Sequence, residues 1–367
     1  MRTPVRASVA LAATRLASRA VPGGDADSVE RGRLESAPGA LDRGAALPTL
    51  SAIVPTYNRR DKLPTVVDAL LADPATTEVV VVVDGCRDGS LELLRERAAT
   101  EPRLKPVFIE NRGTAGAHRA GVEHASGDVV LLLADDVIAA PGMVTGHAHR
   151  HARRERLVVV GYMPISDWRS RPRDRFASYL YAREYERACQ VYDHASENTL
   201  RALWGGNVSL RRIDCLRVGV GSDRFGEDYH EDTDFGLRCL KAGLTGVFDR
   251  SLLAEHAHER TLDGVLRDAR KQGAGKALLH EVHSDVMGPL DTGLFEASLP
   301  RPARWLVRLA RRPRAHRLTV ALLGRIVRAA GALRLFWVEV RVVQLLRRVE
   351  MQAGALATMR RSPAVGA

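Results

Sequence analysis

The chain has 367 residues, of which 45% are hydrophobic, so it can bury one large core or two modest ones. Its four cysteines, Cys86, Cys189, Cys215 and Cys239, form no CxxC pair; this argues against a zinc knuckle or a disulfide framework and fits a reducing cytoplasm. The net charge is +11, but residues 301–367 alone carry +13, so residues 1–300 carry −2. Residues 1–300 therefore lack the spread basic surface that binding to nucleic acid requires.

Residues 1–48 mix glycine, alanine, proline and aspartate without periodicity, and four arginines precede the first acid. A segment of this composition is predicted to be disordered. Its stretch ASVALAAT, at residues 7–14, is at the lower limit of a signal-peptide core, so no secretion signal is predicted. We therefore expect the ordered fold to begin near residue 49.

From residue 50 the chain alternates between apolar runs and amphipathic segments. Strands are predicted at 50–56, 77–84, 105–111 and 127–136, with helices between them at 61–72, 90–100 and 113–125. The strands are almost continuously apolar, as in TEVVVVVDG and GDVVLLLADD, which is typical of a parallel sheet covered by helices on both faces. This order predicts half of a doubly wound α/β sheet.

Polar side chains end these strands, namely Thr56, Asp84, Asn111 and the adjacent pair Asp135 and Asp136. The carboxyl ends of parallel strands meet at one edge of the sheet, where ligands bind in open α/β folds. Two adjacent carboxylates repel each other unless a cation or a hydrogen-bond donor lies between them. The pair therefore indicates a divalent-metal site, and a solvated acidic turn is the alternative.

The loop after the first strand argues against two common nucleotide-binding folds. It reads PTYNRRDKLP and contains no glycine, so its backbone cannot approach a pyrophosphate as in a GxGxxG dinucleotide fold. The string GVGSDRFG at residues 219–226 has the wrong spacing for that motif, and the chain contains no P-loop lysine motif.

Residues 301–367 alternate fifteen arginines with apolar residues at spacings that predict amphipathic helices. No run of 18 uncharged apolar residues occurs there, so a membrane-spanning helix is not predicted. Two interpretations remain open. The helices either lie on anionic lipid, with Trp305, Phe336 and Trp337 at headgroup depth, or form a bundle packed on the α/β part of the chain.

Five segments follow one another in a fixed order. They are IVPTYNR at 53–59, VVVVVDGCRDGS at 79–90, NRGTAGAHRAGVEHASGDVVLLLADD at 111–136, WGGNVSLRR at 204–212 and FGEDYHEDTDFGLRCLKAG at 225–243. In this order they resemble the motifs of family-2 glycosyltransferases of the GT-A fold, over roughly residues 50–280. The resemblance implies an α/β protein with a Rossmann-like, doubly wound mixed sheet and a C-terminal basic helical appendage.

The implied domain organisation has three parts. Residues 1–48 form the disordered segment, residues 49–285 the GT-A glycosyltransferase domain, and residues 286–367 the basic amphipathic helical tail.

The resemblance also implies a donor site and a metal site. The donor-binding residues would be Pro55, Thr56, Tyr57, Asn58, Arg59, Asp84, Gly113 and Asp135, with Asp84 reading the nucleobase. The family's DxD motif begins here with Ala134 instead of an aspartate, so Asp136 is the favoured metal ligand. Late histidines return to the metal in many family members, which points to His256, with His258 as the alternative.

By the same resemblance, Asp232 is the base that removes the acceptor proton, and Glu231 positions the acceptor or tunes that base. Without the family order, both would be read as first-turn helix acids that complement the helix dipole. The acceptor-side loop is assigned to Trp204, Gly205, Gly206 and Asn207, against which the sugars would stack.

These assignments predict an inverting, metal-dependent hexosyltransferase-type enzyme. It would move a sugar from a nucleotide-diphosphate donor to a hydroxyl acceptor, either a glycan, a lipid-linked or a small molecule, in cell-envelope polysaccharide, glycolipid or other glycoconjugate synthesis. Mn²⁺ or Mg²⁺ would neutralise the departing diphosphate. The expected location is the cytoplasm, at the inner face of the plasma membrane if the tail binds lipid. A sugar-phosphate nucleotidyltransferase and an inactive nucleotide-sugar-binding scaffold are the alternatives.

Overall fold

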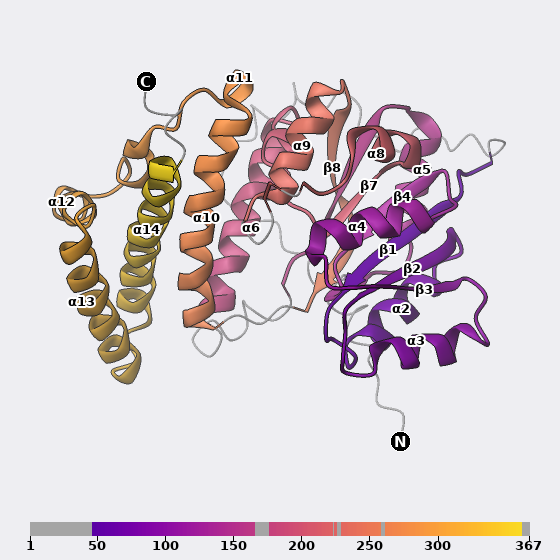
Figure 1. Cartoon of the computed structure of the whole chain (residues 1–367), viewed down its shortest axis with the longest axis horizontal. Coiled ribbons are helices and arrows are strands. Elements are labelled where there is room, and N and C mark those ends of the chain that lie inside the picture. The colour runs from indigo at the N-terminus through magenta and orange to yellow at the C-terminus, as the bar shows by residue number, and fades with distance from the viewer. Residues whose placement is uncertain (1–45, 166–175, 223, 226–228, 258–260, 362–367) are drawn as a thin grey trace, which may run out of the picture.

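The computed structural model describes residues 46–165, 176–222, 224–225, 229–257 and 261–361 (Figure 1). The segment predicted to be disordered lies, up to residue 45, outside the described residues. The described chain folds into a central sheet covered by helices, with further helices from the C-terminal part stacked beside it (Figure 1).

An eight-stranded sheet with the order β3-β2-β1-β4-β7-β6-β8-β5 forms the centre of the fold. The strands are β1 (Leu50–Thr56), β2 (Thr76–Asp84), β3 (Leu104–Ile109), β4 (Val129–Leu133), β5 (Val137–Ala139), β6 (Leu157–Tyr162), β7 (Asn207–Arg211) and β8 (Thr245–His256). Strands β1 to β4 pair in parallel, as their apolar runs predict. The predicted α/β class with a mixed sheet is confirmed.

Helices cover both faces of the sheet, which explains why its central strands carry so few polar residues. One face packs against α2 (Leu63–Leu71), α3 (Ser90–Ala98) and α5 (Met143–Arg153). The other face packs against α4 (Gly113–His124), α8 (Arg212–Val218) and α9 (Glu231–Lys241). Successive strand residues alternate between these two cores, so that Ala52 and Val54 face the first while Ile53 faces the second.

The remaining helices extend the fold away from β3 (Figure 1). They are α6 (Phe176–His194), α7 (Asn198–Arg201), α10 (Leu262–Val282), α11 (Ser284–Met287), the 3₁₀ turn η1 (Thr292–Phe295), α12 (Arg301–Leu309), α13 (Pro313–Ala332) and α14 (Phe336–Arg361). Helix α14 packs between α10 and α13. No helix in the described part of the chain is both long and apolar enough to cross a bilayer.

The C-terminal helices share apolar cores with the rest of the protein. Val340 and Val343 of α14 pack with Leu180 of α6 and Val265 of α10 in one buried cluster. The membrane interpretation of the tail placed Phe336 at headgroup depth, but the structure buries this ring. Only 7% of Phe336 is exposed, because its aromatic ring packs against those of α6 residues. Helix α14 is therefore packed on the protein, as the bundle interpretation predicts. The predicted domain boundary at residue 285 stays a prediction.

Two glycines allow α10 and α14 to pack with their backbones in close contact. A methyl group at Gly273 of α10 would overlap the carbonyl oxygen of Met351. A methyl group at Gly354 of α14 would likewise overlap the carbonyl oxygen of Arg270. Since the colliding atoms belong to backbone, neither helix can relieve the overlap by a rotamer change.

We predict that Gly354→Ala lowers the free energy of unfolding by about 1–3 kcal/mol, because the added methyl group separates α14 from α10. The matched control is Gly324→Ala in α13, where a methyl group meets nothing within 4 Å. That control should gain roughly 0.5–1 kcal/mol from alanine's higher helix propensity. Urea denaturation followed by circular dichroism measures both. Equal stabilities for the two variants would contradict the close packing of α10 and α14.

Candidate active site

The direction of β7 brings the functional ends of the two sheet halves to the same edge. Strand β7 runs antiparallel to β4, and Leu133 at the end of β4 pairs with Asn207 at the start of β7. The residues after β4 therefore face those before β7, and the amide of Ala134 donates to the carbonyl of Gly206 at 3.2 Å. Strand β8 runs parallel to β6 and carries His256 at its carboxyl end to this edge.

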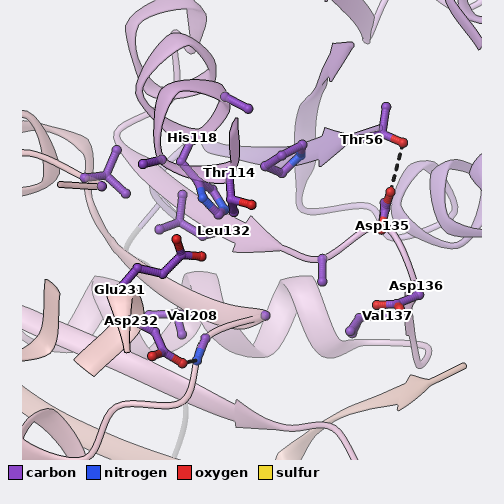
Figure 2. A pocket seen from close by; sticks show the side chains of 18 of the residues that line it. Thr56, Thr114, His118, Leu132, Asp135, Asp136, Val137, Val208, Glu231 and Asp232 are labelled. Carbon is purple, nitrogen blue, oxygen red and sulfur yellow. Dashed lines mark hydrogen bonds between the residues drawn. The ribbon is translucent and has the colours of Figure 1, made fainter. Parts of the chain in front are cut away.

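A cavity of about 610 Å³ opens at this edge (Figure 2). It is lined by most of the residues that the sequence assigned to the site: Pro55, Thr56, Tyr57, Arg59, Asp84, Gly113 and Asp135 of the donor set, Trp204, Gly205 and Gly206 of the acceptor set, and Glu231, Asp232, Asp136 and His256 of the catalytic and metal sets. Residues from distant parts of the sequence thus share one concave surface.

Asp135 and Asp136 form an acidic wall of the cavity, and neighbouring groups balance their charge. The hydroxyl of Thr56 donates to Oδ2 of Asp135 at 2.9 Å (Figure 2). The guanidinium of Arg59 lies 3.6 Å from Oδ1 of Asp135 and donates to Oδ2 of Asp136 at 3.0 Å. Burial raises the pKa of Asp135, and Arg59 and Thr56 oppose this shift. One cation and one hydroxyl therefore stabilise two adjacent carboxylates in a desolvated position.

Asp136 and His256 have the separation that two ligands of one small cation require. Oδ1 of Asp136 lies 3.3 Å from Nε2 of His256, and both residues line the cavity. Two ligands at a right angle, each about 2.1 Å from an octahedral Mg²⁺, would be about 3 Å apart. No group of three or more His, Cys, Asp or Glu side chains that could hold a metal occurs among the described residues. Substrate oxygens and water would have to complete the shell.

His258, the alternative metal ligand predicted from the sequence, lies outside the described residues. Only His256 of this histidine pair can therefore be placed relative to the acidic wall.

The loops after β1 and β2 are hydrogen bonded to their neighbours beside the cavity. Oδ1 of Asp84 accepts from the amide of Arg112 at 2.7 Å, which links the end of β2 to the start of α4. Asn58 adopts a left-handed backbone, with φ +51°, and its Oδ1 accepts from the amide of Arg87 at 2.9 Å. Asn58 therefore orders the loop, and it is not among the residues that line the cavity.

Asp232 and Glu231 begin α9 and lie across the cavity from the acidic wall (Figure 2). Oδ2 of Asp232 accepts from the amide of Gly205 at 2.9 Å, and its Oδ1 accepts from the amide of Thr233 at 2.8 Å. Burial raises the pKa of Asp232, and these amides oppose the shift. The carboxylate is thus fixed in direction and touches the acceptor-side loop.

Glu231 differs from Asp232 because its carboxyl group points into the cavity and makes no hydrogen bond with the described part of the chain (Figure 2). Burial, followed by the nearby charge of Asp232, raises the pKa of Glu231 to about 7. A carboxyl group with this pKa carries a proton for part of the time at neutral pH, so it can both donate and accept a hydrogen bond.

His230, directly before this pair, does not line the cavity but supports it, a role that the sequence did not reveal. It has a left-handed backbone with φ +82°, a conformation that costs energy for a side chain with a Cβ. Burial, together with Lys276, lowers the pKa of His230 to about 4, so the ring is neutral. Its Nε2 lies 3.2 Å from the carbonyl oxygen of Gln272 in α10. This contact anchors the start of α9 to α10.

Asn207 does not occupy the acceptor-side position that the sequence assigned to it. Its side chain is fully buried, with Nδ2 donating to the carbonyl of Leu252 at 3.1 Å and Oδ1 lying 2.9 Å from Nε2 of His147. Alternation along β7 explains the difference, since Val208 lines the cavity and Asn207 therefore faces the opposite side of the sheet. Trp204, Gly205 and Gly206 remain as the predicted acceptor-side residues.

Two further side chains in the cavity wall were not among the site residues predicted from the sequence. Tyr181 lies in α6, and its hydroxyl is 3.3 Å from Nε1 of Trp204. The rings of Tyr181 and His256 are 5.7 Å apart, so Tyr181 lies between Trp204 and His256. His118 of α4 is half-buried, and desolvation of its ring lowers its pKa to about 4, so the imidazole is neutral. Tyr181 stands outside every quoted motif, so only the fold could place it here.

Residues 51–214 match the family model described as glycosyl transferase family 2. This part of the chain is similar to family-2 glycosyltransferases. The earlier resemblance is thereby confirmed. A solved mannosyltransferase from Pyrobaculum calidifontis, in complex with GDP-Man and Mn²⁺, aligns with a TM-score of 0.54 and 19% identity, over 86% of this chain and 88% of that one. This likeness confirms the GT-A fold.

Several curated proteins are similar to parts of the chain. The putative teichuronic acid biosynthesis glycosyltransferase TuaG of Bacillus subtilis is 26% identical over 218 residues, 57% of this chain and 79% of that protein. The glucosyl-dolichyl phosphate glucuronosyltransferase of Haloferax volcanii is 27% identical over 46% of this chain and 55% of that protein. The uncharacterized glycosyltransferase YfnE of Bacillus subtilis is 32% identical, but the match spans only 29% of its length.

We predict that Glu231→Gln becomes more stable relative to the wild type as pH rises from about 4.5 to about 7. In the folded protein the pKa of Glu231 is raised to about 7 from an ordinary value of 4.5. Over this window the folded state retains a proton that the unfolded state has lost, so rising pH removes stability from the wild type alone. Urea denaturation at pH 5, 6, 7 and 8 measures the difference. A difference that does not change with pH would contradict the raised pKa.

Proposed function

We propose that this protein is an inverting glycosyltransferase that transfers a sugar from a nucleotide-diphosphate donor to a hydroxyl acceptor. One observation carries the proposal. The acidic wall of Asp135 and Asp136 and the carboxyl pair of Glu231 and Asp232 lie on opposite sides of one cavity (Figure 2). Such a cavity offers one wall for a divalent cation that would bind the diphosphate and the other for a proton acceptor, which a direct displacement needs.

The donor would lie along the carboxyl ends of β1, β2 and β4. Asp84 is the proposed contact for the nucleobase, because it ends β2 and lines the same cavity as the acidic wall. Thr56 and Arg59 would lie beside the diphosphate, where the guanidinium supplies positive charge. The structurally similar mannosyltransferase was solved with GDP-Man and Mn²⁺, which is consistent with a nucleotide sugar in this fold.

Asp136 and His256 are the proposed protein ligands of a divalent cation. Their 3.3 Å separation and their hard oxygen and imidazole donors fit Mn²⁺ or Mg²⁺. Such an ion, when bound, would neutralise charge that develops on the departing diphosphate. Arg59 already contacts both acids of the wall, so it would add to this neutralisation.

Asp232 is the proposed base. Its carboxylate would take the proton of the acceptor hydroxyl as that oxygen forms a bond to the anomeric carbon of the donor sugar. The bond between this carbon and the diphosphate oxygen breaks, and its electron pair leaves with the nucleoside diphosphate. Attack from the face opposite the leaving group inverts the anomeric configuration. Glu231, half protonated near pH 7, would hydrogen bond the acceptor on the same side.

The acceptor is proposed to be a glycan, lipid-linked or small-molecule hydroxyl in the synthesis of envelope polysaccharide, glycolipid or another glycoconjugate, with the enzyme working in the cytoplasm. Trp204 offers an aromatic face to such a sugar, with Tyr181 behind it. The relatives from Bacillus subtilis and Haloferax volcanii are named for teichuronic acid biosynthesis and for a glucosyl-dolichyl phosphate reaction. These names support an envelope or lipid-linked acceptor.

Incubation of the full chain with a panel of nucleotide-diphosphate sugars, with and without Mn²⁺, tests the function. We expect the nucleoside diphosphate to be released from one donor, faster with the metal, and the sugar to appear with inverted configuration when an acceptor is present. Release of pyrophosphate from a nucleoside triphosphate and a sugar phosphate would identify a nucleotidyltransferase instead. Binding of donors without turnover would identify a scaffold.

We predict that Asp136→Ala abolishes metal-dependent binding of a nucleoside diphosphate, because it removes the carboxylate nearest His256. Asp135→Ala should reduce this binding less than Asp136→Ala does. Asp135 is hydrogen bonded to Thr56 and lies farther from Arg59 than Asp136 does. Isothermal titration calorimetry with Mn²⁺ and the nucleoside diphosphate measures both variants. Undiminished metal-dependent binding by Asp136→Ala would rule out its role as a ligand.

We predict that Asp232→Asn lowers kcat by about 10²–10⁴-fold and leaves donor binding unchanged, because the amide cannot take the acceptor proton. The amide oxygen can still accept a hydrogen bond from Gly205, so the loop should stay in place. Steady-state kinetics and donor titration together separate these effects. A folded Asp232→Asn protein with wild-type turnover would exclude Asp232 as the base.

A further inference from the structure

Helix α13 has an apolar stripe that faces solvent. Leu318, Leu322, Ile326 and Leu333 are 72%, 54%, 37% and 69% exposed. They follow spacings of four and seven residues, so they lie on one side of the helix. A different set of side chains, Thr319, Leu323, Val327 and Ala330, is buried. The helix therefore has one apolar side packed on the protein and a second one uncovered.

Arginines lie along one side of this exposed stripe. Residues 301–335 contain ten arginines and no aspartate or glutamate, and two of the ten, Arg308 and Arg311, pair with Glu296. Arg314, Arg317, Arg325 and Arg328 of α13 are exposed and form no ion pair with any residue that the structure describes. At 100° per residue these four lie on the side of the stripe away from the buried set. The charged side chains of α13 are thus free to meet a partner.

Large exposed side chains also lie in the segments directly before and after α13. Trp305 of α12, just before α13, is 64% exposed, and Trp337 at the start of α14, just after α13, is 60% exposed. Leu335, in the turn between α13 and α14, is 48% exposed. Tryptophan is favoured where an apolar medium meets water, because its ring is apolar and its indole N–H is polar. In Figure 1 α13 lies at the far side of the molecule from the central sheet.

We propose that this face of α13, with the adjoining Trp305, Leu335 and Trp337, docks on an anionic phospholipid bilayer. An apolar stripe beside unpaired arginines is the pattern of a helix that lies in the membrane interface, where leucines enter the acyl boundary and arginines meet the headgroups. A second copy of the chain would bring like-charged faces together, and a nucleic acid would leave the leucines in water. The lipid surface satisfies both features.

This proposal names α13 as the docking element. The other long tail helix, α14, is not available for this role, because Val340, Val343 and Leu346 are buried against the body of the protein. The docking surface is also separate from the cavity, since none of its residues lines that cavity. Membrane binding can therefore be tested without reference to sugar transfer.

The experiment is co-sedimentation of the full chain with vesicles of phosphatidylcholine alone and of phosphatidylcholine with phosphatidylglycerol, at low and high salt. We expect binding to the anionic vesicles that weakens as salt rises. Arg325→Gln/Arg328→Gln should weaken it by about 5-fold per arginine, roughly 25-fold for the pair. The matched control is Arg95→Gln/Arg187→Gln, which removes two exposed arginines of α3 and α6. The control should bind like the wild type.

A second pair of variants tests the apolar stripe. Leu318→Ser/Leu322→Ser should lose vesicle binding even at low salt, whereas Ile213→Ser, which changes a side chain 76% exposed on α8, should not. These sites are exposed, so the fold should survive, and circular dichroism checks this. Equal binding by the stripe variant and its control, or equal binding to neutral and anionic vesicles, would overturn the proposal. So would a dimer that forms without lipid and is lost in the stripe variant.

Discussion

Helix α10 is the element on which both the carboxyl pair and the C-terminal helices depend, and it makes its closest contacts through glycine. On one side Gly275 lies against the carbonyl of Tyr229, two residues before Glu231. On the other side Gly273 lies against the carbonyl of Met351 in α14. A side chain at either glycine would push a neighbouring backbone away. The start of α9 is further fixed by the bond between His230 and the carbonyl of Gln272. The strained backbone of His230 persists because α10 holds it in place.

The same helix links the tail to the cavity through side chains. Nη2 of Arg347 in α14 donates to Oε1 of Gln272 at 3.2 Å and to Oε2 of Glu184 in α6 at 2.6 Å. Helix α6 in turn contributes Tyr181 to the cavity wall. A tail that bound a surface would thus be mechanically joined to two parts of the site. The predicted boundary at residue 285 lies between Gln272 and Arg347 in the sequence. These contacts therefore join the two predicted parts of the chain.

The sequence could predict the parts of the site that follow parallel strands. Thr56, Asp84 and Asp135 each come after an apolar run, and parallel strands must end at one edge, so their proximity follows from periodicity. The sequence could not predict that Asn207 faces away from the cavity, because the side of β7 that faces the cavity depends on the antiparallel pairing of β7 with β4. The prediction that Phe336 lies at headgroup depth was wrong for a related reason. An amphipathic pattern shows that a helix has an apolar side, but only the packed neighbours decide whether protein or another phase covers it.

Ala134, at the position where the family resemblance expects the first acid of a DxD motif, is consistent with the charges of the wall. Asp135 and Asp136 already share one guanidinium, that of Arg59, and burial makes each unpaired carboxylate costly. A third acid at position 134 would lie next to Gly206, whose carbonyl accepts the amide of Ala134, and would add charge beside two carboxylates that already share Arg59. The small side chain therefore lets β4 and the loop before β7 approach closely. It also adds no further charge to a wall in which two carboxylates share one guanidinium.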